Sequence, residues 1–354
     1  MNDFAMKTSD FLIIGAGIIG LSIARELQRR HPDAKVTIID KENGPGFHAS
    51  GRNSGVLHSG IYYTADSLKA SFTRNGNLAW QEYCAERSLS IDKCGKLIVP
   101  RDEQELQTLS TLEERGAQNS VEVNRVDHKR AGNIESRAKV FEQALFVPST
   151  ATVDPLEIVR SLEHDFKENG GSIRYNCPFM GRESKSAIQT SQGLFSAGYI
   201  VNCAGLYADR VAQAFGFGQG YVMLPFKGLY LYAGSKANAP KVHIYPVPDL
   251  RNPFLGVHFT RTIDEKTKIG PTAIPALWRE NYQGLEGFKW DEFVQVLGCE
   301  LKMFCSGSNG FRRLAWQEMK KQRKSTMVAE AASLMHDTKD KGFDKWGQPG
   351  IRAQ

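Results

Sequence analysis

A run of glycines near the N-terminus constrains this chain more than any other feature. Residues 15–20 have the spacing GxGxxG and lie between the apolar run 11–14 and an amphipathic segment that extends to about residue 30. A second apolar run, residues 36–39, ends at Asp40, which is 20 positions after the last of these glycines. A strand, a glycine turn, a helix and an acidic residue at this spacing predict a βαβ unit that binds a dinucleotide.

The residues of this unit have expected roles. Gly15 permits a tight turn, Gly17 lets the backbone approach a pyrophosphate, and Gly20 lets the helix pack closely on the sheet. The N-terminus of the helix faces the anion. Asp40 accepts hydrogen bonds from ribose hydroxyls, and the adjacent Lys41 belongs to the same expected cofactor site. The alternative is a glycine turn followed by an incidental surface aspartate.

The loop from Ser50 to Gly60 distinguishes between a nicotinamide and a flavin cofactor. It consists mainly of small and polar residues, which allow the main chain to run against an extended, buried cofactor. Arginine offsets phosphate charge there, and serine and asparagine supply hydrogen bonds. This composition favours flavin, whereas the alternative is an ordinary surface loop. The expected contacts are Ser50, Arg52, Asn53, Ser54 and Gly55.

Composition and charge argue against several other classes of protein. The chain has 354 residues, 41% hydrophobic and 24% charged, which suits two domains or one large α/β unit. A net charge of +6 without a long basic block does not indicate nucleic-acid binding. The six cysteines form no CxxC pair, so no metal site is predicted. Neither a signal peptide nor a run of roughly 18 apolar residues is found, which predicts a cytoplasmic protein with at most peripheral contact with the inner face of the membrane.

Later segments predict further elements of the same kind. A helix is expected from Leu68 to about Glu86, and a strand is expected to end where a helix starts at Pro155. A strand over residues 172–175 and a buried strand ending at Gly205 extend the first sheet. Between residues 224 and 275, aromatic runs alternate with Pro, Gly and Asn turns, which is typical of an antiparallel sheet.

These elements predict an α/β protein, α+β overall. A Rossmann-like flavin-binding domain is expected to be discontinuous, with a largely antiparallel-sheet substrate domain inserted into it. The expected boundaries are residues 1–85, 150–223 and 330–354 for the cofactor domain and residues 86–149 and 224–329 for the substrate domain.

Four segments together resemble the L-2-hydroxyglutarate oxidase/dehydrogenase family, a branch of the D-amino-acid-oxidase-like FAD-dependent superfamily. They are the glycine motif, residues 49–63, residues 201–209, and the pair 243–248 with 255–260. The glycine motif is common to many flavoproteins, but residues 49–63 combined with 243–260 are specific to this branch. The resemblance extends from about Phe11 to Gln354.

The resemblance implies FAD and oxidation of L-2-hydroxyglutarate to 2-oxoglutarate, with electrons passed to oxygen or a membrane quinone. We expect the FAD to be non-covalent, because no cysteine or histidine of the sequence compels its attachment. The resemblance also implies that residues 202–205 pass the adenosine side of FAD and that Val153 lies near it. The cofactor residues implied in this way are Val153, Cys203, Ala204 and Gly205. A buried strand without ligand contact is the alternative for both segments.

Oxidation of an α-hydroxy acid requires a base near the hydroxyl group and cations near the carboxylates. Histidine is the natural base near neutral pH, and His58 and His258 are the candidates, with buried structural histidines as the alternative. Arg352 is favoured as a carboxylate ligand because residues 349–354 resemble the family segment that returns to the active site. The full set of substrate candidates is Tyr62, Lys227, Tyr245, Thr260, Arg261 and Arg352.

Members of the family continue beyond the position of Gln354 into a final strand and a loop that closes over the flavin. We therefore expect no closing strand or helix at residues 350–354, one unpaired sheet edge and a more open flavin site. Two alternatives remain at this point. One is another superfamily enzyme that acts on an amino acid, a methylated glycine or glycerol 3-phosphate, and the other is a truncated, inactive flavoprotein.

Overall fold

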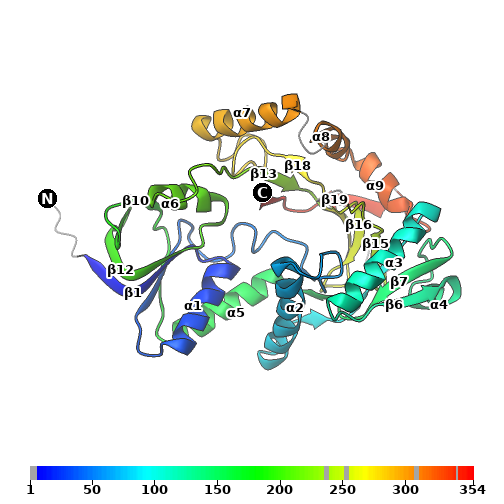
Figure 1. The fold of residues 1–354 in the computed structure, drawn as a ribbon, viewed down its shortest axis with the longest axis horizontal. Helices are drawn as coiled ribbons and strands as arrows, with labels where there is room; N and C mark the ends of the chain where they lie inside the picture. The colour runs from blue at the N-terminus through cyan, green and yellow to red at the C-terminus, as the bar shows by residue number, and fades with distance from the viewer. Residues whose placement is uncertain (1–5, 235–238, 251–254, 307–310, 340–341) are drawn as a thin grey trace.

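The structure is a computed structural model that describes residues 6–234, 239–250, 255–306, 311–339 and 342–354. Two large β-sheets dominate it and lie toward opposite ends of the long axis (Figure 1). The six-stranded sheet is accompanied by helices α1 (Ile18–Arg30), α5 (Pro155–Glu168) and α6 (Ala208–Ala214). The eight-stranded sheet lies near α3 (Glu103–Gln118) and α4 (His128–Ile134), and α2 (Leu68–Glu86) lies between the two ends.

The six-stranded sheet contains the expected βαβ unit. Strands β1 (Lys7–Ile14) and β2 (Val36–Ile39) are parallel neighbours joined by α1. The later segments extend this sheet as predicted, because β12 pairs with β1 and β9 pairs with β2, both in parallel. The full order is β10 (Phe179–Arg182), β11 (Ala187–Thr190), β12 (Gly193–Asn202), β1, β2 and β9 (Ser172–Arg174).

Apolar side chains cover both faces of this sheet, which explains why β1 and β2 are continuous apolar runs. Ile13 and Ile38 pack with Leu21 of α1 and Leu162 of α5 on one face. Leu12, Ile14 and Ile39 pack with Val211 of α6 on the other. Helix α5 begins where the sequence indicated, with Pro155 in its first turn and the Asp154 carboxylate accepting hydrogen bonds from the amides of Leu156 and Glu157.

The eight-stranded sheet is largely antiparallel, with one parallel pair formed by β15 and β5. It brings together segments that are far apart in the sequence. Its order is β19 (Phe343–Trp346), β14 (Leu231–Ala233), β17 (Thr267–Gly270), β16 (His258–Arg261), β15 (His243–Pro246), β5 (Lys96–Val99), β7 (Gln143–Val147) and β6 (Asn124–Asp127).

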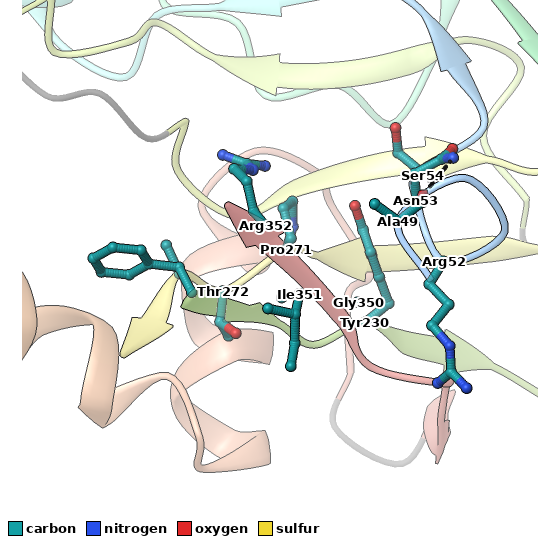
Figure 2. A pocket seen from close by; sticks show the side chains of 13 residues that line it. Ala49, Arg52, Asn53, Ser54, Tyr230, Pro271, Thr272, Gly350, Ile351 and Arg352 are labelled. Atoms are coloured by element: carbon teal, nitrogen blue, oxygen red, sulfur yellow. Dashed lines mark hydrogen bonds between the residues drawn. The ribbon is translucent and has the colours of Figure 1, made fainter. Parts of the chain in front are cut away.

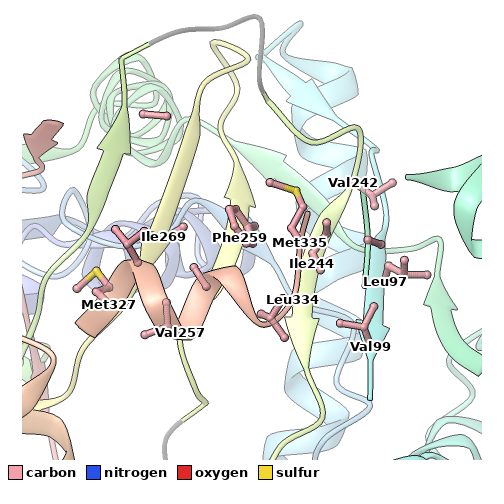
Figure 3. Packing of buried hydrophobic residues seen from close by; sticks show 14 of the residues in the cluster. Leu97, Val99, Val242, Ile244, Val257, Phe259, Ile269, Met327, Leu334 and Met335 are labelled. Atoms are coloured by element: carbon pink, nitrogen blue, oxygen red, sulfur yellow. The ribbon is translucent and has the colours of Figure 1, made fainter. Parts of the chain in front are cut away.

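The two faces of its central strands differ in character. One face carries apolar side chains that pack against Met327 of α9 (Lys324–Ala332) and against Leu334 and Met335 after it (Figure 3). The opposite face carries Lys96, His243, Tyr245, His258, Thr260 and Lys268, all buried. Since side chains alternate along a strand, the apolar core on one face commits these polar side chains to the other.

Two small sheets complete the described fold. One has the order β3 (Val56–Leu57), β8 (Ala151–Val153) and β4 (Ile91–Asp92), and the other has β18 (Ile274–Pro275), β13 (Pro225–Gly228) and β20 (Gly350–Ala353). Helices α7 (Trp290–Ser306) and α8 (Phe311–Lys320) lie beside β13 and β18 (Figure 1). No helix among the described residues is long and apolar enough to cross a membrane.

One expectation about the last residues is wrong. Residues 350–353 form the strand β20, which pairs antiparallel with β13 through the registers Phe226–Arg352 and Lys227–Ile351. The backbone hydrogen bonds to β13 determine this pairing, and no sequence pattern within the short segment itself indicates a strand. In addition, β19 joins the eight-stranded sheet, so described residues of the segment 330–354 pair with strands other than those of the six-stranded sheet.

Candidate functional site

The larger of two cavities at the site, about 720 Å³, lies at the carboxyl ends of β1, β2 and β12. Ile14, Ile39 and Cys203, at or just after these strand ends, contribute to its wall. Open parallel sheets bind their ligands at this edge, and the volume is in the range of small-molecule and cofactor sites. Its position and size fit the adenosine and pyrophosphate half of a dinucleotide.

Two of the three glycines occupy positions where a side chain has no room, and the third is closely approached by a side chain. Gly15 has φ +114°, and a Cβ there would lie 2.3 Å from the carbonyl oxygen of Cys203. A Cβ on Gly20 would lie 1.9 Å from the carbonyl oxygen of Gly15. At Gly17 the nearest atom would be the Ser50 Oγ, 3.0 Å away. The turn, the helix and β12 therefore approach one another as closely as the backbone permits.

Asp40 and Ser50 hold this turn in shape from within the cavity wall. The Asp40 carboxylate accepts hydrogen bonds from the amide of Ala16 at 2.6 Å and from the amide of Glu42 at 2.8 Å. The Ser50 hydroxyl accepts a hydrogen bond from the amide of Ile18, the first residue of α1, at 2.9 Å. Each carboxylate oxygen has more than one lone pair, so Asp40 retains acceptor capacity for a ribose hydroxyl.

Lys41 also lines the cavity, but its ammonium group is committed to two carboxylates. It donates to Glu42 and, over 2.7 Å, to Glu280. His48 bonds the Glu42 carboxylate at 2.9 Å, and the ligand atoms of Glu42, His48 and Glu280 lie within 4.8 Å of one another. The Lys41 charge occupies this acidic cluster, which therefore gives no reason to add a metal ion.

The loop after Ser50 also borders a second cavity of about 180 Å³, whose lining residues are shown in Figure 2. Ala49 and Asn53 line both cavities, so the two adjoin at this loop. Arg52 and Ser54 line only the smaller one. An extended cofactor with its adenosine half in the large cavity would reach the smaller cavity along this loop.

One expected cofactor residue is partly committed within the protein, and two line neither cavity. The Arg52 guanidinium donates to the carbonyls of Phe47 and Pro349, so its donors are partly used within the protein. The Val153 amide donates to the Gly55 carbonyl over 2.9 Å, and neither of these residues is on the wall of either cavity. By contrast, the residues after β12 do line the large cavity, namely Cys203, Ala204 and Gly205.

Three histidines gather on the buried polar face of the eight-stranded sheet or against it. The His258 ring stacks on Tyr245 with centroids 3.8 Å apart, and His58 meets the same tyrosine edge-on at 6.1 Å. His243 is held at both ring nitrogens, by Thr152 at 3.1 Å and by the amide of Arg261 at 3.2 Å. The structure therefore brings both candidate bases together and adds a third imidazole with a structural role.

The hydrogen bonds of His258 leave one ring nitrogen available. Its Nδ1 lies 2.9 Å from the carbonyl oxygen of Gly256, which can only accept, so Nδ1 carries the proton and Nε2 carries the lone pair. Burial lowers the pKa of His258 to about 3 and lowers that of His58 well below its ordinary value. Both imidazoles are therefore neutral at physiological pH and able to accept a proton.

Positive charges surround these imidazoles. The charges of Lys96, Lys268 and Arg352 each add to the effect of burial on the pKa of His258. Burial also lowers the pKa of Lys96 to about 7 and that of Lys268 to about 8. A dianionic ligand would offset this concentration of positive charge.

The expected carboxylate ligands divide into two groups. Arg352 lines the smaller cavity together with Tyr230 and the loop after Ser50 (Figure 2). Three other expected ligands lie at the polar face, namely Tyr62, Tyr245 and Thr260. Each of their hydroxyl groups is buried and forms no hydrogen bond with the usual distance and angles to another described residue.

Arg261 and Lys227 stand apart from this group. Arg261 pairs with Asp92 at 2.7 Å and with Glu265 at 2.8 Å. Lys227 donates to Asn281 over 3.3 Å, and its neighbours on β13, Phe226 and Gly228, line the smaller cavity while Lys227 does not. The period-two alternation of the strand turns Lys227 away from that cavity.

Lys96, Lys268 and Tyr230 also lie at this candidate site and were not among the residues expected from the sequence. Tyr230 lines the smaller cavity and lies under Lys268, whose Nζ is 4.7 Å from the ring centroid. A lysine within the otherwise apolar run Lys96–Val99 is the one sequence signal that was available. A charged residue in a fully buried strand is rare unless it has a partner or a function.

Comparisons with known proteins agree with this geometry. The profile of the DAO family, FAD dependent oxidoreductase, matches residues 10–337. L-2-hydroxyglutarate dehydrogenase of Escherichia coli K12 is 37% identical over 314 residues, which are 86% of this chain and 71% of that protein. Mitochondrial L-2-hydroxyglutarate dehydrogenase of Bos taurus is 39% identical over 292 residues, 77% of this chain and 63% of that protein.

Solved structures show the same fold at lower identity. The L-alpha-glycerophosphate oxidase of Mycoplasma pneumoniae, with FAD bound, has a TM-score of 0.78 at 20% identity, over 98% of this chain and 84% of that chain. Glycine oxidase of Geobacillus kaustophilus has a TM-score of 0.73 at 16% identity, over 99% and 84%. The profile and the sequence relatives cover most of the chain, so it belongs to the FAD-dependent oxidoreductase family, on the branch of the L-2-hydroxyglutarate dehydrogenases, with FAD as its cofactor.

Proposed function

We propose that this protein oxidises L-2-hydroxyglutarate to 2-oxoglutarate. The names of its relatives in Escherichia coli and Bos taurus support this substrate. The observation that carries the proposal is the arrangement next to the cofactor site, where two neutral, buried imidazoles lie within the electrostatic influence of Lys96 and Arg352. A dicarboxylate with a hydroxyl group to be deprotonated matches both features.

His258 is the preferred base in this mechanism. Its Nε2 lone pair is free, and its ring is held by stacking on Tyr245 and by the bond from Nδ1 to Gly256. It takes the proton from the substrate hydroxyl as the C2 hydrogen leaves as hydride. FAD, when bound, supplies the hydride acceptor. His58 is the second candidate, because its Nδ1 is buried without a hydrogen-bond partner among the described residues.

Substrate binding is expected to strengthen the base. The pKa of His258 is low because the site is buried and surrounded by cations. Two carboxylates brought into the site offset those charges and raise the pKa of the imidazole toward the range in which proton transfer is efficient. Arg352, on the wall of the smaller cavity, is assigned to the carboxylate next to the reacting carbon, since a guanidinium can bind it through two parallel hydrogen bonds.

Two further assignments belong to this proposal. With FAD bound, the electron acceptor would be oxygen or a quinone at a membrane that the protein contacts peripherally. The chain divides into a cofactor domain and a substrate domain, with the six-stranded sheet in the first and the polar face of the eight-stranded sheet in the second. Oxygen consumption measured against reduction of a soluble quinone analogue distinguishes the two acceptors.

Anaerobic titration of the purified FAD-loaded protein tests the substrate. L-2-hydroxyglutarate is expected to bleach the flavin absorbance, whereas D-2-hydroxyglutarate, glycine, sarcosine, D-alanine and glycerol 3-phosphate are expected to leave it unchanged. Reduction by one of the amines or by glycerol 3-phosphate alone would assign the protein to another activity of the superfamily. A protein that cannot be loaded with FAD at all would contradict the proposal.

A further inference from the structure

Lys96 is buried inside the eight-stranded sheet, where a charged side chain is rare unless it has a partner or a function. It begins β5 in the middle of the eight-stranded sheet, with 0% of its surface exposed, and lies opposite His243 of β15. Its Nζ is 4.4 Å from the centroid of the Tyr62 ring and 5.3 Å from that of Tyr245. These ring faces attract a cation, but they supply no oxygen to accept its hydrogen bonds.

Polar atoms next to Lys96 also lack ordinary hydrogen bonds. Lys96 Nζ and the Tyr62 hydroxyl are buried and have no hydrogen-bond partner among the described residues, and the Tyr245 hydroxyl forms no bond of normal geometry. Buried polar groups almost always have partners, and a cluster of exceptions in one place indicates a ligand or ordered water. All three groups can donate hydrogen bonds.

Two other buried cations of this protein have carboxylate partners, in contrast to Lys96 and to Lys268, whose Nζ lies over the Tyr230 ring. Arg279 is also 0% exposed, and it forms an ion pair with Asp209 at 2.7 Å. Lys321 is 8% exposed and pairs with Glu318 at 2.6 Å. The acidic residue nearest to Lys96 in the sequence, Asp92, pairs with Arg261. The Lys96 ammonium group therefore has no acidic partner among the described residues, and it is available to bind an anionic ligand.

We propose that Lys96, together with the hydroxyls of Tyr62 and Tyr245, binds the substrate carboxylate that is remote from the flavin. This rests on the proposed function and adds a specificity-determining residue to it. Arg352 belongs to β20 in a different sheet, so the two carboxylates are bound by cations from two separate parts of the fold. The enzyme is therefore selective for dicarboxylic over monocarboxylic 2-hydroxy acids.

Binding of two unreactive ligands tests this subsite without turnover. Glutarate lacks the hydroxyl group and cannot be oxidised, and pentanoate has the same chain with one carboxylate replaced by a methyl group. Both are titrated into the FAD-loaded protein and followed by calorimetry and by the change in flavin absorbance. The wild-type protein is expected to bind glutarate at least about tenfold more tightly than pentanoate.

The variant Lys96→Met keeps the length of the side chain and removes its charge. It is expected to weaken glutarate binding by roughly 30-fold or more, to leave pentanoate binding within about twofold, and so to remove the preference. Lys93→Met is the matched control, because Lys93 is exposed and three residues away. It is expected to bind both ligands as the wild type does.

Single-hydroxyl variants test the same subsite if Lys96→Met does not fold. Tyr62→Phe and Tyr245→Phe are each expected to weaken glutarate binding roughly 2- to 10-fold and to leave pentanoate unchanged. The inference is overturned if the wild type does not prefer glutarate, if Lys96→Met keeps that preference, or if the tyrosine variants lose both ligands equally. A wild type that binds glutarate selectively but is not reduced by L-2-hydroxyglutarate refutes the proposed function and leaves the subsite standing.

Discussion

The two halves of the site are built in different ways. At the edge of the six-stranded sheet, backbone atoms form the cavity, and glycines are present because no side chain fits between the turn and β12. On the polar face of the eight-stranded sheet, side chains form the site, and they come from strands as far apart in the sequence as Lys96 and Lys268. The first half depends on close backbone approach and the second on buried charge.

This difference predicts how substitutions in each half of the site affect cofactor binding, stability and chemistry. A substitution at the backbone edge should remove the cofactor and damage the fold together, because both depend on the same close approach. A substitution on the polar face should leave the fold intact or stabilise it while changing chemistry, since buried unpaired polar groups usually cost stability and persist for function.

The largest effect is expected from Gly15→Val. The new Cβ would lie 2.3 Å from the Cys203 carbonyl oxygen at a backbone φ of +114° that L side chains rarely adopt. We expect loss of bound FAD and a fall of roughly 4 kcal/mol or more in the free energy of unfolding. Flavin absorbance and denaturant unfolding measure the two.

Gly181→Ala is the control for this variant. Gly181 lines the same cavity, and no atom lies within 4 Å of the position of its Cβ. It is expected to retain FAD and to change stability by less than about 1 kcal/mol. Equal damage by both substitutions would refute the idea that close backbone approach defines this half of the site.

His258→Gln comes next in size. Removing the base is expected to lower the rate constant of anaerobic flavin reduction by L-2-hydroxyglutarate roughly 10²- to 10⁴-fold, with FAD still bound. Stopped-flow absorbance measures this step directly. His31→Gln, at an exposed position, is the control. If His58→Gln shows the large loss and His258→Gln does not, the base is His58.

Lys96→Met also changes how stability depends on pH. In the folded, ligand-free protein the pKa of Lys96 is about 7, below its unfolded value, so between pH 7 and 10 the unfolded chain binds more protons. The free energy of unfolding therefore rises with pH in this window, and this group contributes roughly 3–4 kcal/mol to the rise.

Lys96→Met should remove that contribution and be more stable than the wild type at pH 7. Urea unfolding of both proteins at several pH values measures it. The same pH dependence in the two proteins would show that Lys96 is not held in the environment described above. Lys268, whose pKa is lowered to about 8, continues to contribute a rise of the same sign in the variant.

The smallest effect is expected from Arg261→Gln. The Arg261 guanidinium is already paired with Asp92 and Glu265 in a partly exposed position, so we expect a loss of stability of about 1 kcal/mol or less and a KM within about twofold of the wild type. Arg352→Gln, in contrast, should raise KM roughly 10- to 100-fold. Steady-state kinetics compares them, and a larger rise for Arg261→Gln would reverse the assignment.

The sequence predicted those elements whose periodicity and ends are both determined by neighbouring residues. Helix α2 has the predicted bounds, and α5 starts at Pro155 after the Asp154 cap. The strand β20 was not predicted, since four residues at the end of the chain have no periodicity that separates a strand from a loop until β13 lies beside them. The ion pair of Arg261 with Asp92 was not predicted either, because the two residues are far apart in the sequence and meet only in the folded chain.

By itself, the sequence determined the βαβ unit, the dinucleotide turn and the preference for a flavin, because glycine spacing and apolar runs act over a few residues whose geometry is fixed locally. Only the tertiary structure decided which charged residues share one buried face. Lys96, His243, Thr260 and Lys268 form one row because the registers of β5, β15, β16 and β17 align them. Strand register is a long-range property, set by the packing of the opposite apolar face on α9, and no local pattern encodes it.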